Sequence, residues 1–496
     1  MEINMSDSKS RRNFLITASA ATALTGMNIS TATAKDLKEN NSLLFRTRRN
    51  VIDNLAKPDL DALRIGVGEL KKISQFRPND VPSWLSQAGI HGDCTGFTKC
   101  QHGNWYFAPW HRVYLHYFEQ LIAHYSGKSD FSLPYWDWTE TAKVPDSFYG
   151  SETPLDDDVT VKKFCKDAPN IGRGRSKNEF VQKIEYDTYL SRDIISSILS
   201  DPDFKSFGGD SSGKGRLEAT PHNFIHRWVG GVKESNMVQA FSPLDPIFWL
   251  HHCNIDRLYS NWLSRPNNRP PTDNKEWANK SFNDFMNFKK ETVGSEWTCG
   301  KTTNSKSLGY LYDTDQNLIP LQNEGMKKKK NINLLLSATS KSFTQSDNKL
   351  TYVIEQPNIK DSQKILSSAA LSPQEHIVRL TIKGIKTPAQ QNTSVDIYLG
   401  KYINIENPKD NPGYVGSITF FDVKNGNRHH DMNTATVLSA TKAYQNLYGE
   451  IGIKKDEPIE ISITTRKLFS EVTDYGSVQE IAPENVSIEI LSINTN

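Results

Sequence analysis

Histidine is the residue type with the most chemistry to offer in this 496-residue chain, and its positions are uneven. Nine of the twelve histidines fall between residues 91 and 252. Most of these form two groups: His91, His102 and His111, then His222, His226, His251 and His252. Neutral imidazole binds copper, zinc, iron and nickel, so two such groups predict a metal centre.

The spacing of His222 and His226 supports a metal centre. The two residues are four apart, so on a helix both rings emerge on one face with Cβ atoms ~5–6 Å apart, which suits chelation. Without a metal, a buried pair of this kind would need other partners for its ring nitrogens. A lone pair is weak evidence, but the downstream histidines and the first group strengthen it.

Helical phase separates His111 from its neighbours. Four apolar or aromatic residues share its helical face: Tyr114, Leu115, Phe118 and Ile122. His111 is therefore expected to point into the core. His116 and His124 lie off that face and are expected to be surface or structural histidines.

Helical phase alone does not show whether His251 or His252 is the metal ligand. Asp256 follows His252 by four residues, where its carboxylate could orient a ligand imidazole from the outer shell. This spacing favours His252 as the ligand.

Together the two groups resemble the copper A and copper B regions of the tyrosinase, catechol oxidase and hemocyanin superfamily. The resemblance rests on the nine-residue gap from His102 to His111, the Pro-Trp-His-Arg turn at 109–112 and the His-x-x-x-His pair. It also rests on Asp-Pro-Ile-Phe-x-x-His-His-x-Asn-x-Asp-Arg at 245–257. It is strong over residues ~85–265.

The resemblance implies a centre of two copper ions with O₂ as co-substrate. Carried over residue by residue, the copper A ligands are His91, His102 and His111, and the copper B ligands are His222, His226 and His252. Phe248 matches the aromatic residue packed beside the site. The centre would convert o-diphenols to o-quinones, and monophenols, where accepted, would first be hydroxylated ortho.

A monophenol must lose its proton near pH 7, although free phenol has a pKa of ~10. In the family a Glu and an Asn hold a water for this task. Glu218, four residues before His222, and Asn223, directly after it, are the candidates. The alternative role for Glu218 is a charge that complements the dipole at a helix N-terminus.

One of the five cysteines has a candidate role by the same resemblance. Cys100 and His102 stand at the Cys-x-His spacing at which fungal members form a thioether. Plant members use a Cys nearer the first ligand, for which Cys94 is an imperfect match. A small buried thiol is the alternative.

Three other functions fit the same histidines. They are an o-aminophenol oxidase on the same copper site, a hemocyanin-like O₂ carrier, and a zinc or iron hydrolase. Hydrolytic sites often include carboxylate ligands, which disfavours the last.

The surrounding sequence predicts a mainly α fold: a helical-bundle dicopper core with long loops over 35–315. Four segments are expected to be helical: about 41–75, 110–125, 221–228 and 246–263. A polar linker that contains Lys327–Lys330 is expected over 316–349, and a C-terminal β-sandwich over 350–496. Six strands are expected there: Leu350–Glu355, Ile377–Ile382, Ser394–Leu399, Tyr414–Phe421, Ile459–Thr465 and Val486–Ile493.

Two further resemblances concern how this core is bounded and covered. Leu308–Tyr312 resembles the Tyr-x-Tyr motif that closes the core of plant polyphenol oxidases. The segment around Phe420-Phe421-Asp422-Val423 resembles their C-terminal shielding domain, which inserts a side chain over the copper entrance. The C-terminal domain is therefore expected to keep the enzyme latent; a passive stabilising or partner-binding domain is the alternative.

The N-terminus predicts export. Ser10–Leu15 begins a twin-arginine pattern, a weakly apolar run follows, and Ala32-Thr33-Ala34 is a cleavage signal, so residues 1–34 are expected to be a signal peptide. The protein is expected to be periplasmic or secreted, with phenolic or catecholic small molecules and the twin-arginine machinery as partners. A net charge of +2 indicates neither nucleic acid nor an anionic membrane as partner.

Overall fold

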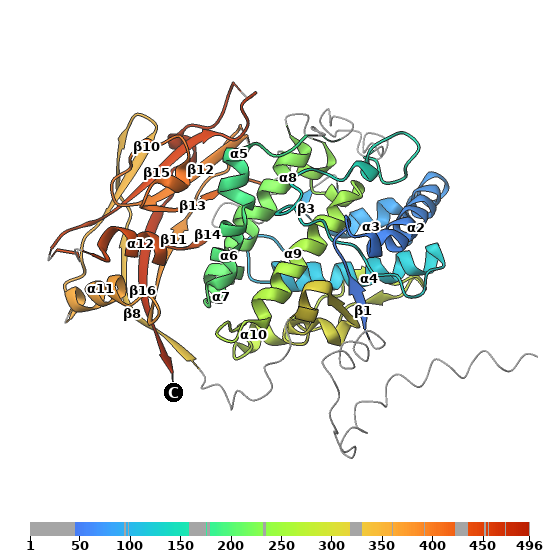
Figure 1. Ribbon diagram of the computed structural model, residues 1–496, viewed down its shortest axis with the longest axis horizontal. Helices are drawn as coiled ribbons and strands as arrows, with labels where there is room; N and C mark the ends of the chain where they lie inside the picture. The colour runs from blue at the N-terminus through green and yellow to red at the C-terminus, as the bar shows by residue number, and fades with distance from the viewer. Residues whose placement is uncertain are drawn as a thin grey trace, which may run out of the picture. The chain divides into compact units, whose positions relative to one another are not determined.

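The computed structural model describes residues 45–495, with gaps at 94–95, 98, 158–174, 176–178, 232–234, 318–329, 360, 391, 422–434, 451–452, 455 and 472. The expected signal peptide lies outside the described residues. Residues Arg46–Asn496 form one compact unit. Within it we distinguish a helical half, residues 45–317, from a C-terminal half, residues 330–495 (Figure 1).

Two long helices form the centre of the helical half. Almost every residue is buried in α4 (Phe107–Ser126) and in α9 (Ile247–Ser264), as expected for helices surrounded by protein on all sides. In contrast, α2 (Lys57–Phe76) buries one face, through Ala62, Leu63, Gly66, Val67 and Leu70, and packs on α4. Gly66 lies close against Ile122, so this packing fixes the C-terminal end of α4.

Smaller elements complete the helical half. They are α3 (Trp84–His91), α5 (Lys183–Glu185), α6 (Arg192–Ser200), α7 (Phe204–Gly208), α10 (Lys275–Asn279), and the short strand pairs β2 (Gly92–Asp93) with β3 (Gly96–Phe97) and β5 (Phe285–Met286) with β6 (Thr292–Val293). None of the helices in the described ranges is long and apolar enough to cross a membrane.

The expected helix at 41–75 begins later than predicted. Arg46–Arg48 is a strand, β1, which pairs in parallel with β7 (Tyr310–Tyr312). The helix proper starts at Lys57, with Pro58 in its first turn. The partner of β1 lies more than 260 residues away in the chain, so local periodicity could not indicate this strand.

The expected helix at 221–228 begins earlier than predicted. One π-helical turn, η5 (Glu218–His222), leads directly into α8 (Asn223–Gly230), with Pro221 inside the turn. Pro221 has no N–H to donate within this turn, and the Asn223 N–H donates to the Glu218 carbonyl five residues before it. Such π-turns are frequent at functional sites.

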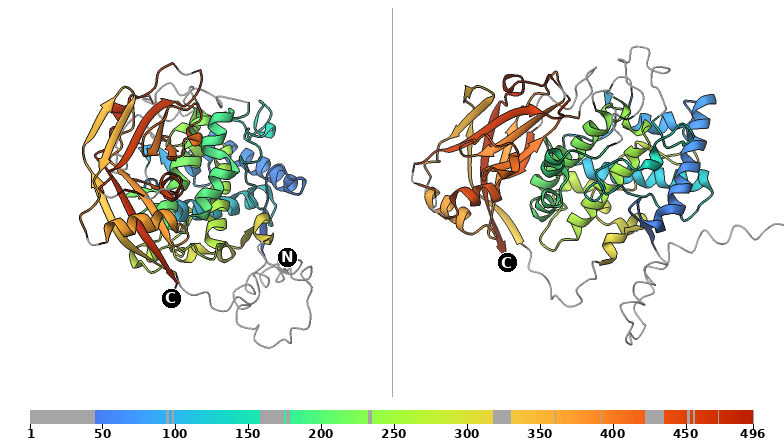
Figure 2. Two further views of the ribbon diagram at one scale, coloured as in Figure 1. Left: turned by 60° about the vertical axis from the view of Figure 1, so that its left-hand side comes forward. Right: turned by 45° about the horizontal axis from the view of Figure 1, so that its top comes forward.

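The C-terminal half contributes nine strands to two five-stranded sheets. Its strands are β8 (Lys330–Ser340), β9 (Phe343–Ser346), β10 (Lys349–Ile354), β11 (His376–Lys383), β12 (Thr393–Leu399), β13 (Tyr414–Ile418), β14 (Ala435–Ser439), β15 (Ile459–Lys467) and β16 (Asn485–Thr495). One sheet has the order β13-β12-β15-β10-β9, and the other has the order β4-β14-β11-β16-β8, where β4 (Gly213–Lys214) comes from the helical half. Figure 2 shows the strands of the C-terminal half beside the helices. Buried side chains from both sheets form one hydrophobic cluster, together with α11 (Ser362–Leu371), α12 (Thr441–Tyr448) and α13 (Val478–Ile481).

The second part of the expected linker is not a linker. Residues 330–340 form β8, which pairs antiparallel with β16, and 343–346 form β9, which pairs with β10. Both are edge strands, and their largely exposed, polar side chains make their sequence similar to that of a linker. The C-terminal half therefore begins at about residue 330, and most of the remaining linker lies outside the described residues.

The two halves share a sheet. The helical half contributes β4 (Gly213–Lys214), which pairs in parallel with β14 at the sheet edge, with Gly213 opposite Ala435. A buried ion pair also joins them, since Arg379 Nη1 lies 2.8 Å from Asp203 Oδ2. The halves are thus joined by backbone pairing as well as by side chains.

Candidate metal centre

The six histidines expected as copper ligands lie together, and each is at most 8% exposed. His91 ends α3, His102 lies in the loop before α4, His111 is in α4, His222 ends η5, His226 is in α8 and His252 is in α9. The two groups face each other: the ring centroids of His111 and His252 are 4.3 Å apart, and those of His102 and His222 are 5.4 Å apart.

These rings fit a metal. Burial lowers the pKa of His91 to about 4 and that of His226 to about 3, so both are neutral near pH 7. Their Nδ1 atoms lie 2.5 Å from the Ala240 carbonyl and 2.6 Å from the Met237 carbonyl. A carbonyl can only accept, so each Nδ1 carries the proton and each Nε2 keeps its lone pair.

The same arrangement holds at His111, whose Nδ1 lies 2.8 Å from the Phe107 carbonyl. Within the described residues, the buried Nε2 atoms of His91, His111 and His222 have no hydrogen-bond partner. Buried polar atoms are rarely left unsatisfied, so several of them in one place indicate a binding site for a metal ion. Histidine nitrogens without carboxylates suit copper, which they can hold in both of its common oxidation states.

The structure also bears on the choice between His251 and His252. The Trp138 indole N–H donates to His251 Nδ1 at 3.3 Å, so a neutral His251 ring must carry its proton on Nε2. That nitrogen then has no lone pair for a metal. His252 Nε2, in contrast, lies 3.3 Å from His226 Nε2. The geometry therefore favours His252.

The reason that the sequence offered for His252 is wrong, however. Asp256 does not orient the ring: His252 Nδ1 has no hydrogen-bond partner within the described residues. The carboxylate instead accepts hydrogen bonds from two arginines and two tyrosines, namely Arg48, Arg112, Tyr310 and Tyr312. Spacing on one helix could not reveal these partners, because they come from β1, α4 and β7.

This buried network joins the two helices that carry His111 and His252. Arg112 follows His111 on α4 and donates to Asp256 on α9, while Arg48 bridges Asp256 to Glu119 of α4. Breaking one partner of a buried ion pair typically costs ~3–5 kcal/mol. The network thereby holds α4 and α9 at a defined separation one turn from the ligands.

Cys100 lies where a bond to His102 could form. Its Sγ is 3.2 Å from His102 Nδ1, and the thiol is 2% exposed. Burial raises the pKa of the Cys100 thiol, so it is protonated near pH 7. Cys94 lies outside the described residues.

Glu218 and Asn223 flank His222 and are both buried. The Glu218 carboxylate accepts the Gly103 N–H at 2.8 Å, next to His102. Asn223 Oδ1 lies 2.9 Å from His222 Nδ1, and its Nδ2 donates to the Thr419 carbonyl at 3.0 Å. The side chains of Glu218 and Asn223 are therefore each hydrogen-bonded to protein groups next to a ligand histidine.

Two aromatic rings cover the histidines. Phe248, one turn before His252 on α9, lies 4.1 Å from that ring between centroids. Phe421, from the C-terminal half, stacks on His226 with centroids 3.9 Å apart and an interplanar angle of 21°. The sequence indicated the motif around Phe421, but only the structure singles out this ring from Phe420, which packs in the C-terminal cluster instead.

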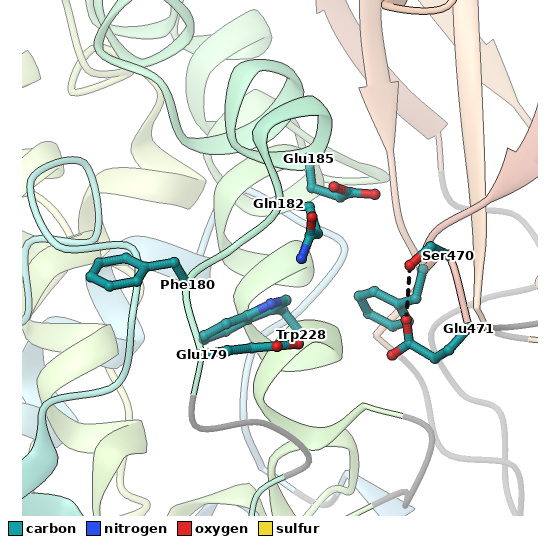
Figure 3. Close-up of a pocket in the computed structure, with 8 residues that line it drawn as sticks. Glu179, Phe180, Gln182, Glu185, Trp228, Ser470 and Glu471 are labelled. Carbon is teal, nitrogen blue, oxygen red and sulfur yellow. Dashed lines mark hydrogen bonds between the residues drawn. The ribbon is translucent and has the colours of Figure 1, made fainter.

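A small pocket lies elsewhere, between the two halves (Figure 3). Its lining is Glu179, Phe180, Gln182, Glu185, Trp228, Phe469, Ser470 and Glu471. It contains none of the expected site residues, although Trp228 follows His226 by two residues on α8. The chemistry lies with the histidines, where ring side chains fill the space.

Comparisons with known proteins agree with this site. A family model described as "Common central domain of tyrosinase" matches residues 81–265, which contain all six histidines. Over 442 residues the chain is 28% identical to a tyrosinase of Hahella sp. (strain CCB-MM4), covering 77% of this chain and 86% of that protein. It is 25% identical over 442 residues to a chloroplastic polyphenol oxidase of Malus domestica, covering 80% and 72%.

The fold is also shared with a solved structure. A recombinantly expressed latent aurone synthase (polyphenol oxidase) superposes with a TM-score of 0.63 at 20% sequence identity. The superposition covers 91% of this chain and 90% of that one, so it includes both halves.

Proposed function

We propose that this chain is a dinuclear copper phenol oxidase of the tyrosinase family, which oxidises both monophenols and o-diphenols to o-quinones. His91, His102 and His111 would hold one copper, and His222, His226 and His252 the other. The copper pair, when bound, supplies the activation of O₂. The observation that carries the assignment is that the two groups of buried rings face each other, with His111 and His252 centroids 4.3 Å apart, while the Nε2 atoms of His91, His111 and His222 have no hydrogen-bond partner within the described residues.

The chain's own residues would bind and orient the phenol. Phe421 shows that an aromatic ring fits flat against His226. A phenol that displaced Phe421 would take the same stacked position, with Phe248 beside the neighbouring ligand His252. These rings would exclude water and present the phenol oxygen to the centre.

Oxygen uptake tests this function. Full-length copper-loaded protein is expected to consume O₂ with tyrosine and, faster, with dopamine, with 2-aminophenol as a comparison substrate. Copper should be present at two ions per chain. Absence of O₂ uptake with both phenols, in protein that holds two coppers and in which the cover over His226 has been opened, would contradict the assignment.

Glu218 and Asn223 are proposed to hold the water that takes the proton of a monophenol. We expect Glu218→Gln to depress tyrosine hydroxylation about 10²-fold or more relative to dopamine oxidation, because only the monophenol needs this base. The measurement is the ratio of the two initial rates for the variant and the unmodified protein. Equal losses on both substrates would instead make Glu218 a structural residue that holds the Gly103 N–H.

Cys100 is proposed to form a thioether with His102, on the basis of the 3.2 Å approach of Sγ to that ring. The bond would form with loss of one hydrogen from the thiol and one from the ring carbon, and O₂, the co-substrate, would accept both and leave as hydrogen peroxide. Intact mass would then be lower by two hydrogens, and reductant would not restore it. Cys100 alkylated in a peptide map under denaturing conditions would exclude the bond.

The C-terminal half, with its two sheets and shared core, is proposed to be the expected β-sandwich and to act as a shielding domain. Phe421, stacked on His226, supports this role. Residues 1–34 are proposed to direct export by the twin-arginine route, on the basis of the pattern at Ser10–Leu15.

A further inference from the structure

The amide of Asn223 connects a ligand histidine to the C-terminal half. On one side its Oδ1 lies 2.9 Å from His222 Nδ1. On the other side its Nδ2 lies 3.0 Å from the main-chain carbonyl of Thr419, 196 residues further along the chain. All the groups in this chain of contacts are buried.

The Thr419 carbonyl determines which group donates and which accepts in each of these hydrogen bonds. The Thr419 carbonyl can only accept, so the Asn223 atom that faces it must be the NH₂ group. The other amide atom, which faces His222, is then the oxygen, and His222 Nδ1 must carry the proton. A neutral ring with its proton on Nδ1 has its lone pair on Nε2, the form that binds a metal.

Three of the other rings are oriented within the helical half. His91, His111 and His226 face main-chain carbonyls of the helical half, at Ala240, Phe107 and Met237 respectively. A carbonyl can only accept a hydrogen bond from a ring nitrogen. The side-chain amide beside His222 can either accept or donate, because rotation by 180° exchanges its oxygen and its NH₂ group. The Thr419 carbonyl disfavours that rotation.

The Thr419 carbonyl is itself held against the helical half. The Thr419 N–H donates to the Ala219 carbonyl at 3.4 Å, and Thr220 Oγ1 donates to the Ser417 carbonyl at 3.3 Å. Pairing of β4 with β14 lies a few residues before Ala219. The end of β13 thus lies along η5, the turn that ends at His222.

We propose that the main-chain carbonyl of Thr419, acting through Asn223, fixes His222 in its metal-binding tautomer. The C-terminal half is then a positioning element of the copper B site as well as a cover for it. This inference rests on the copper centre proposed above, but it concerns copper retention and not phenol turnover.

The test compares full-length variants for loss of copper to a Cu(I) chelator, with copper per chain measured over time and no phenol present. Thr419→Pro removes the N–H that anchors the carbonyl and is expected to speed the loss of one of the two coppers about 10–100-fold, the usual effect of an outer-shell partner. Thr419→Val keeps the main chain and is expected to release copper like the unmodified protein. Phe421→Ala opens the cover without touching the carbonyl and is also expected to retain copper.

Asn223→Asp provides the rescue. A carboxylate accepts from His222 Nδ1 in either orientation, so Thr419→Pro combined with Asn223→Asp is expected to regain slow release. Fast release by the double variant, or slow release by Thr419→Pro alone, would overturn the proposal. Equally fast copper release by Phe421→Ala would also overturn the proposal, because it would show that exposure of the site to solvent is enough to release copper.

If Thr419→Pro does not fold, Asn223→Ala and Asn223→Asp in the otherwise unchanged chain decide. The alanine variant is expected to lose one copper and the aspartate variant to keep both. Retention of both coppers by the alanine variant would overturn the proposal. A protein that passes these tests but oxidises no phenol would refute the proposed function alone.

Discussion

His226→Ala is expected to leave one copper per chain and to lower dopamine oxidation by at least about 10³-fold. His226 Nδ1 lies 2.6 Å from the Met237 carbonyl and its Nε2 lies 3.3 Å from His252 Nε2, so the alanine variant removes one of the proposed ligand nitrogens. A metal contributes several kcal/mol to a reaction of this kind, and each ~1.4 kcal/mol is a factor of ten. The measurements are copper content by elemental analysis and initial rates of O₂ uptake.

His124→Ala is the matched control for this variant. His124 is an exposed histidine on α4 that stacks on Phe288, with centroids 4.7 Å apart, on a different part of the helical half. Its replacement is expected to leave copper content and rate unchanged. Full activity in His226→Ala would refute the ligand assignment, and loss of copper in His124→Ala would show that the assay detects general damage to the fold.

Phe421→Ala is expected to raise the turnover of bulky diphenols at least about tenfold. The Phe421 ring occupies the stacked position on His226 that a substrate ring needs, and an aromatic stack is worth ~0.5–1.5 kcal/mol beyond the area that it buries. The measurement is kcat/KM for a bulky catechol with the full-length variant and the unmodified chain. The increase should be smaller for dopamine, which needs less space.

Phe420→Leu is the control for the cover. Phe420 belongs to the C-terminal hydrophobic cluster, and a leucine of similar volume should cost less than about 1.5 kcal/mol of stability without opening the site. Equal activation by both variants would indicate general loosening of the C-terminal half. No activation by Phe421→Ala would refute the shielding role.

Cleavage of the linker alone is expected to activate less than Phe421→Ala does. A protease site introduced between 318 and 329 would cut the chain, but the β4–β14 pairing and the Arg379–Asp203 ion pair would still hold the halves together. Gel filtration of the cleaved protein shows whether the halves remain associated.

The sequence by itself determined the parts of this protein that depend on local pattern. The i,i+4 spacing of His222 and His226 and the phase of His111 placed these rings correctly on helices, because a helix repeats every 3.6 residues whatever surrounds it. Alternating apolar residues likewise indicated six strands of the C-terminal half, each of which is present. The copper ligands as a set came from the family resemblance of these motifs.

Tertiary structure decided everything that depends on pairing between distant segments. Asp256 lies at helical spacing from His252, but its partners Arg48 and Tyr310 come from strands at opposite ends of the helical half. Residues 330–340 and 343–346, which were expected to belong to a linker, form edge strands because β16 and β10 provide backbone partners for them. No periodicity within either segment could indicate these contacts.

The same reason explains the contacts between the halves. Phe421 and Thr419 reach His226 and Asn223 across about 200 residues of chain, and β4 joins a sheet whose other strands lie beyond residue 330. Local sequence sets which conformations a segment prefers, but packing sets which segments meet. The sequence therefore determined which side chains could hold copper, while the tertiary structure decided which other groups orient and cover them.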